Sequence, residues 1–237
     1  MTMKPPFQQS LRCVINLGNP LLAQAHGKTA IGVSVDLADA LAKHWGLSCE
    51  LLIVNNAREA VAALEAKQAD LGFLAVDPAR AQLLQFTNAY LEIEGCYLVK
   101  AISNITHIDA VDRPGHSVVV GLGSAYDLFL SRHLKHAALI KAESSKAVVP
   151  TFVHGSADVA AGVKEQLLSD MQTHSDLRML EGNFMVIKQA LVVHQDSGTE
   201  ALAEVQAFVN ACLTNGFLAQ AMQRHRVSGA RLVQPPH

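Results

Sequence analysis

Short apolar runs alternate with segments of helical periodicity along most of the chain. Apolar runs bounded by turn residues predict strands, and apolar positions recurring every three or four residues predict helices. In the first part, strands are expected at 11–18, 49–54 and 70–76, and helices at 34–46 and 56–69. This alternation is typical of βαβ units around a largely parallel sheet.

A second alternating set follows the polar stretch at 102–117. Its strands are expected at 118–123, 138–142 and 158–163, and its helices from Ser124, near 144–153 and over 164–174. Two long extended segments, 90–100 and 184–193, precede and follow this set, and helices at 199–216 and 217–225 close the chain before a tail that we expect to be loosely held.

The whole pattern predicts an α/β protein of two Rossmann-like lobes, joined by a two-strand hinge with a ligand cleft between them. Lobe 1 is expected to comprise residues 10–98 plus 190–237, and lobe 2 residues 99–189.

Composition narrows the function classes. Half of the 237 residues are apolar and the net charge is −2, which argues against nucleic acid or an anionic membrane surface as the main partner. No apolar run is long enough for a transmembrane helix, so no membrane insertion is expected, and the start of the chain lacks the apolar core of a secretory signal. The four cysteines are widely spaced and the histidines form no ligand motif, so we expect free thiols, no metal and no cofactor.

One cation stands out in an apolar stretch. Asp77 suits a helix N-cap and Pro78 the first helical position, which places Arg80 in the first turn of a helix. The helix dipole is already positive there, so a bound anion would remove an electrostatic misfit. A solvated arginine, or a salt bridge to a nearby carboxylate, is the other interpretation.

A second candidate anion site lies at the turn after residues 118–121. Gly121 and Gly123 allow close backbone approach, and Ser124 is a suitable cap for the helix that follows. A simple tight turn explains the same residues.

Three stretches, "GVSVDLADALAKHWG", "ADLGFLAVDPARAQLLQFTNAYLEIEGCYLV" and "VVVGLGSAYDLFL", occur in an order and spacing that resemble the family 3 (polar amino acid type) extracellular solute-binding proteins of ABC importers. The resemblance extends over about residues 11–225. It implies the type II periplasmic-binding-protein fold and capture of a small carboxylate, such as an amino acid or related organic acid. It also implies a monomer in the periplasm that delivers ligand to an ABC permease, whereas the missing signal leaves a cytoplasmic location open.

The resemblance also implies roles for individual residues. Arg80 matches the arginine that grips the ligand carboxylate, and Ala75 a position whose backbone N–H reaches the same group. Gly72 and Phe73 match residues lining that strand end. In the other lobe, Gly123, Ser124 and Ala125 match the turn that offers N–H groups to the anion. Asn19 lies in the loop that covers the ligand, where it would hydrogen-bond a polar ligand or only form a turn.

One departure from the family concerns the ligand's ammonium group. The position where amino-acid binders carry an aspartate for this group is Val163 here. Either the ligand has no α-ammonium, or another acid holds it. Glu94 on the first hinge strand is the candidate, and a solvent-facing strand residue is its other interpretation.

Two other functions stay open. The same fold hosts an enzyme, cyclohexadienyl dehydratase, but no residue here stands in a recognisable catalytic pattern, so we expect a protein that is not an enzyme. A ligand sensor that feeds no transporter is the second alternative.

Overall fold

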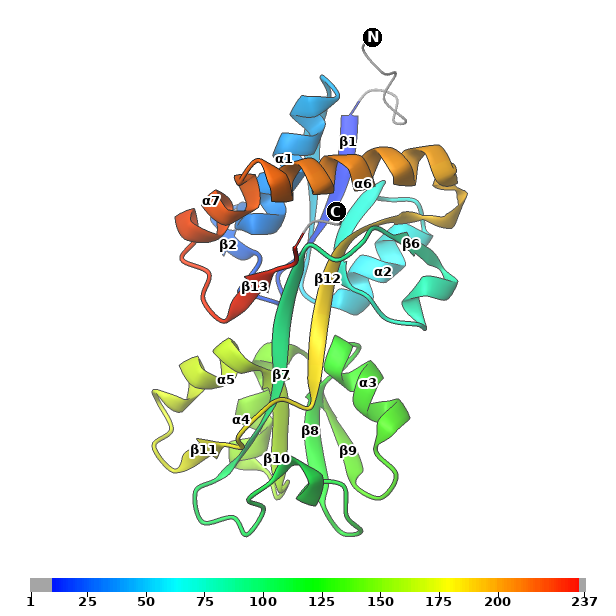
Figure 1. Cartoon of the computed structure of the whole chain (residues 1–237). Coiled ribbons are helices and arrows are strands. Elements are labelled where there is room, and N and C mark those ends of the chain that lie inside the picture. Colours follow the sequence, from blue (N-terminus) through cyan, green and yellow to red (C-terminus); the bar gives the residue numbers. More distant parts are fainter. Residues whose placement is uncertain (1–9, 235–237) are drawn as a thin grey trace. The chain divides into compact units, whose positions relative to one another are not determined.

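The computed structural model describes residues 10–234, which form two compact α/β units (Figure 1). Of these residues, those up to Glu92 and those from Lys188 onward form unit 1, and Ile93–Ile187 form unit 2. The chain therefore passes between the units twice, within strands β7 (Leu91–Lys100) and β12 (Met185–His194). The lobe boundaries expected at residues 98 and 190 fall in these same two strands and stay a prediction.

The sheet of unit 1 is assembled from both ends of the chain. Strand β1 (Ser10–Asn16) pairs in parallel with β4 (Ser48–Val54) on one side and with β5 (Leu71–Ala75) on the other. Strand β12 pairs antiparallel with β5, from Gln189 opposite Ala75 to Val193 opposite Leu71. All five residues of β5 are buried, so this strand is the centre of the unit's core.

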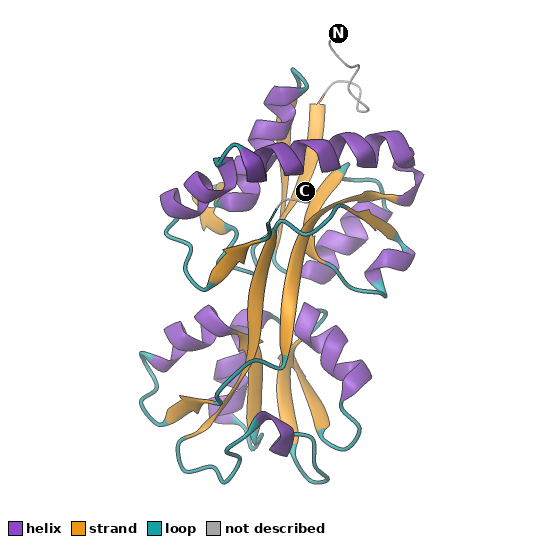
Figure 2. Ribbon diagram, viewed as in Figure 1, coloured by secondary structure: helices purple, strands orange, loops and turns teal. Residues whose placement is uncertain are grey.

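Helices lie outside the strands within each unit (Figure 2). In unit 1 they are α1 (Val33–His44), α2 (Ala57–Glu65), α6 (Gly198–Thr214) and α7 (Phe217–Arg224). The Asn56 side chain accepts a hydrogen bond from the Glu59 amide at the start of α2, as a capping residue should. Asp36 on α1 contacts Arg224 and His225, which ties α7 to α1 and gives Asp36 a structural role.

The sheet of unit 2 mixes both strand directions. Strand β7 pairs antiparallel with β10 (Val159–Val163), which pairs in parallel with β8 (Ser117–Gly121). Strand β9 (Ala138–Ala142) continues the parallel set, and the short β11 (Leu177–Met179) pairs antiparallel with β7. The helices of this unit are α3 (Ala125–His133), α4 (Val148–His154) and α5 (Lys164–Met171), with 3-10 turns at Ile108–Ala110 and Ser145–Ala147.

Two local expectations were wrong. The segment around Arg80 is a three-residue 3-10 helix, Arg80–Gln82, instead of an α-helix. The C-terminal tail contains a strand, β13 (Ala230–Leu232), which pairs with β7 and is held by an ion pair between Arg231 and Glu92. Three further short strands were not expected: the hairpin of β2 (Gln24–His26) with β3 (Thr29–Ile31), and β6 (Leu84–Phe86), which pairs with β12.

The carboxylate of Asp112 holds the segment that leads into β9. It accepts backbone hydrogen bonds from Lys135 at 2.9 Å, His136 at 2.8 Å and Ala137 at 2.9 Å, the three residues that precede β9. The bond from Ala137, with those from Lys135 and His136, holds the pKa of Asp112 below its ordinary value. The ionised side chain therefore stabilises the folded state.

We expect Asp112→Ala to lower the free energy of unfolding by about 2 kcal/mol at pH 7, because three amides lose a charged acceptor. This stabilisation is fully present above the unfolded carboxyl pKa of about 3.9 and is lost as the pH falls through the lower folded pKa. Urea denaturation at pH 7 and pH 3 measures both effects. Glu181→Ala, at an exposed turn residue, is the control, and an Asp112→Ala deficit unchanged at pH 3 would contradict this account.

Candidate functional site

Arg80 is buried at the carboxyl end of β5. Only 4% of the surface of this residue is exposed to solvent. Its Nη1 donates a hydrogen bond to the Ala75 carbonyl oxygen at 2.9 Å. Burial lowers the pKa of Arg80 to about 10, and the charge of Asp77 opposes this shift. The guanidinium is thus still a cation at neutral pH, desolvated and held in place beside the strand end.

Asp77 positions the turn that carries Arg80. It is buried, its Oδ1 accepts a hydrogen bond from the Ala79 amide at 2.8 Å, and its carbonyl accepts one from Ala81. The predicted capping role of Asp77 is wrong in detail, because the N-cap of the 3-10 helix is Ala79, without a side-chain capping bond. Asp77 instead bonds to the amide of Ala79, the residue before that helix.

Gly72 and Phe73 belong to the core of the same strand. A Cβ at Gly72 would lie 2.9 Å from Leu64 Cδ1 and 3.0 Å from Val14 Cγ1, so any larger residue there would force these core side chains to shift. Phe73 is 5% exposed. Both residues support the strand end at Ala75 from within, and their contact with a ligand stays a prediction.

Asn19 lies in the loop that follows β1. Its Oδ1 accepts a hydrogen bond from the Leu21 amide at 3.3 Å, and its carbonyl accepts bonds from Leu22 and Ala23. These bonds form a turn, which was one of the two interpretations of Asn19 from the sequence. The loop is packed tightly, because a Cβ at Gly32, where φ is +137°, would lie 2.3 Å from the Leu22 carbonyl oxygen.

In unit 2, an internal carboxylate already lies at the start of α3. Ser124 caps the helix, and its Oγ accepts a hydrogen bond from the Asp127 amide at 3.0 Å. The Asp127 side chain reaches back, and its Oδ2 accepts a hydrogen bond from the Gly123 amide at 2.8 Å. Asp127 is 1% exposed and pairs with Lys141 at 3.2 Å. The Gly123 amide that the sequence assigned to a ligand anion thus bonds to the protein itself.

The sequence carried a signal for Asp127 that was overlooked. Residues 124–127 read Ser-Ala-Tyr-Asp, and a hydroxyl cap followed three residues later by an acid resembles the reciprocal capping arrangement. Ala125 is the first residue of α3 and lies inside this arrangement. The ligand contacts expected for Ser124 and Ala125 stay predictions.

Glu94 on β7 is engaged by a cation. Because Gly95 lies opposite Val163 in the antiparallel pair, Glu94 and Lys164 come next to each other. Lys164 Nζ donates to Glu94 Oε2 at 2.6 Å, and both side chains are 40% exposed. This hydrogen bond raises the pKa of Lys164. Any ligand ammonium that binds Glu94 must compete with Lys164.

The predicted residues thus fall into two groups. Unit 1 brings together Arg80, Ala75, Gly72 and Phe73 along β5, and Asn19 follows the neighbouring strand β1. Unit 2 holds Ser124 and Ala125 at the end of β8 and Glu94 on β7. Within residues 10–234, no group of three or more His, Cys, Asp or Glu side chains is placed to hold a metal ion.

Over residues 11–227, the chain matches the family described as bacterial extracellular solute-binding proteins, family 3. The chain belongs to this family. The match confirms the predicted fold class, whose two α/β units and two crossing strands the structure shows. Among curated proteins, none matches the chain in sequence.

Solved structures of this family's fold are similar over nearly the whole chain. AbpA, an amino acid ABC transporter substrate-binding protein from Streptococcus pneumoniae bound to L-arginine, has a TM-score of 0.77 at 17% identity, covering 91% of this chain and 94% of its own. The cysteine-binding protein of Campylobacter jejuni has a TM-score of 0.77 at 16% identity, with coverages of 91% and 88%.

A histidine kinase sensor domain with similarity to periplasmic binding proteins has a TM-score of 0.79 at 14% identity, covering 95% of this chain and 98% of its own. At such identities the likeness shows the fold, and these neighbours are binding and sensor proteins rather than enzymes. In the part of this family member that the structure describes, no helix has the length and apolar character needed to cross a membrane.

We expect Asp127→Ala to lower the free energy of unfolding by about 1–3 kcal/mol. The Gly123 amide would lose its side-chain acceptor, and the first turn of α3 would lose the carboxylate that interacts favourably with the helix dipole. Asp127→Asn should lose less, since it keeps an acceptor. Urea unfolding followed by circular dichroism measures both variants.

Lys141→Met distinguishes the contribution of the Lys141–Asp127 ion pair to stability from that of the hydrogen bond between the Gly123 amide and Asp127. Lys141 is 46% exposed, so this variant should cost only a few tenths of a kcal/mol. A loss as large as that of Asp127→Ala would show that the ion pair, not the cap, stabilises the turn.

Proposed function

We propose that this family 3 protein captures a small carboxylate-bearing ligand, an amino acid or a related organic acid, between its two units and delivers it to an ABC permease as a monomer in the periplasm. The observation that carries the proposal is the buried, hydrogen-bonded cation Arg80 at the strand end of unit 1. The described neighbours AbpA and the cysteine-binding protein, whose names state amino-acid binding, support it.

The physical argument starts from the cost of burying a charge. Taking a guanidinium out of water costs several kcal/mol unless anions and hydrogen bonds compensate it. The Ala75 carbonyl and Asp77 compensate part of this cost. A ligand carboxylate can add a bidentate pair, which is both strong and selective for planar anions. Arg80 is therefore the residue we assign to the carboxylate, with the Ala75 amide beside it.

Three further residues are proposed to contact the ligand. Asn19 is proposed to approach the ligand from the loop after β1, and Ser124 and Ala125 from unit 2. Contacts from both units would favour a closed arrangement in proportion to their differential affinity.

The similar histidine kinase sensor domain supports a second candidate, a sensor that binds the same ligand class without a transporter. Growth on the ligand after deletion of the gene separates import from sensing.

We expect Arg80→Met to abolish ligand binding while the protein remains folded. A thermal-shift panel of L-amino acids and their 2-oxo and 2-hydroxy analogues identifies the ligand, since a ligand at 100 times its Kd stabilises by about 2.7 kcal/mol. Calorimetry on that ligand should then show a loss of about 2–5 kcal/mol in Arg80→Met.

Arg58→Met, at an exposed residue of α2, is the matched control and should bind as the wild type does. Unchanged affinity in Arg80→Met would remove the carboxylate assignment, and circular dichroism of the variant shows whether a loss of binding reflects a loss of fold.

The pair of Glu94 and Lys164 tests whether the ligand carries an α-ammonium. If Glu94 holds this group, Glu94→Gln should weaken an amino acid at least tenfold and leave its 2-hydroxy analogue unchanged. Lys164→Met should strengthen the amino acid, because the competing cation is gone. Lys146→Met, at an exposed residue, is the control. If neither variant changes the ratio of the two affinities, Glu94 is not a ligand residue.

A further inference from the structure

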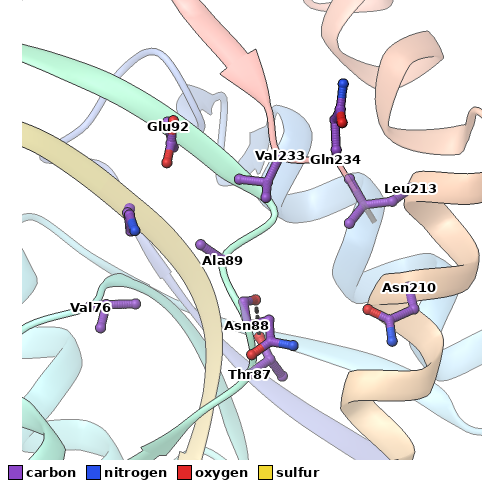
Figure 3. A pocket seen from close by; sticks show the side chains of 10 residues that line it. Val76, Thr87, Asn88, Ala89, Glu92, Asn210, Leu213, Val233 and Gln234 are labelled. Atoms are coloured by element: carbon purple, nitrogen blue, oxygen red, sulfur yellow. Dashed lines mark hydrogen bonds between the residues drawn. The ribbon is translucent and has the colours of Figure 1, made fainter. Parts of the chain in front are cut away.

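Unit 1 contains a cavity of about 410 Å³ whose lining residues all belong to that unit (Figure 3). Its walls come from the segment that leads into β7, from β12, from α6 and from the residues that follow β13. The volume lies within the range of small-molecule sites. Arg80 and Asn19 do not line it, so it is separate from the ligand site proposed above.

One charge in this cavity is not neutralised. Glu92 is paired with Arg231, whose Nε and Nη2 lie 2.8 Å and 2.7 Å from Glu92 Oε2. Lys188 lines the cavity from β12, and its ammonium forms no ion pair with any residue between 10 and 234. Its backbone carbonyl accepts a hydrogen bond from Val76, which fixes the main chain at this point. The cavity therefore offers an available cation on a rigid strand.

Carboxamides add hydrogen-bond donors. Asn88 and Asn210 both line the cavity. The Asn210 Oδ1 accepts a hydrogen bond from Gln206 Nε2 at 2.8 Å, so its remaining hydrogen-bonding capacity is mainly that of its NH₂ donors. A cation together with amide donors suits a carboxylate rather than an ammonium group.

The rest of the lining is aliphatic. Val76, Leu213 and Val233 contribute branched apolar side chains to the wall, and Val76 is 42% exposed. A ligand that covers these side chains removes apolar surface from water, at about 25 cal/mol for each Å². The preferred ligand should thus carry an alkyl chain as well as an anionic head.

We propose that this cavity is a second binding site, specific for small aliphatic monocarboxylates, with Lys188 and the carboxamides at the head group and Val76, Leu213 and Val233 along the chain. The site lies at Glu92 and Lys188, the two residues at which the chain leaves and re-enters unit 1. Its occupancy is independent of Arg80.

Calorimetry with sodium hexanoate tests the proposal in the wild type and in Arg80→Met, which removes the carboxylate site proposed above. Hexanoate should bind both proteins with equal affinity. Lys188→Met should weaken hexanoate at least tenfold, hexanamide should bind the wild type at least tenfold more weakly than hexanoate does, and Leu213→Ser should reduce the preference for hexanoate over acetate.

Lys28→Met, at an exposed residue of the turn between β2 and β3, is the matched control and should bind hexanoate normally. Absence of saturable binding in the wild type would overturn the proposal. So would binding that is lost in Arg80→Met and unchanged in Lys188→Met, since hexanoate would then report the carboxylate site alone.

Discussion

The pairing of β5 with β12 is the interaction on which the rest of unit 1 depends. Strand β5 lies between β1, which comes from the start of the chain, and β12, which comes from its last quarter. All five of its residues are buried, and Gly72 lets Val14 and Leu64 approach closely. Because this strand is fixed from both sides, its carboxyl end holds Ala75, and through the Ala75 carbonyl it holds the Arg80 guanidinium.

Much of the fold could be read from the sequence, because its signals are local. The apolar run at Ala138–Ala142 is a strand with the expected bounds, and Asn56 and Ser124 cap helices as their residue types predict. The strand β13 was missed because three residues carry too little periodicity. It pairs with β7 and carries an ion pair between Arg231 and Glu92, which are far apart in the sequence.

The sequence indicates candidate site residues, whose contact with a ligand stays a prediction, but it does not indicate the internal charge balance around them. A cation after Asp77-Pro78 and a turn before Ser124 are visible in the residues. The sequence does not reveal that the Asp127 side chain accepts a hydrogen bond from the Gly123 amide, or that Lys164 forms an ion pair with Glu94. Such internal counter-ions depend on side-chain geometry, and they decide which groups remain for a ligand. Arg80 is far more buried than Glu94, so an added anion there would offset more of the cost of burying charge.

The double passage of the chain through β7 and β12 has a consequence for biosynthesis. Unit 2 is one continuous segment, whereas unit 1 needs β12, α6 and α7, which the ribosome delivers last. Unit 2 is therefore complete while β5 still lacks its neighbour. A folded unit 2 holds the ends of its own segment at a fixed separation, which shortens the loop that unit 1 must close and lowers the entropic cost of that closure. Vectorial synthesis thus favours an order in which the inserted unit folds first and templates the arrival of β12 beside β5.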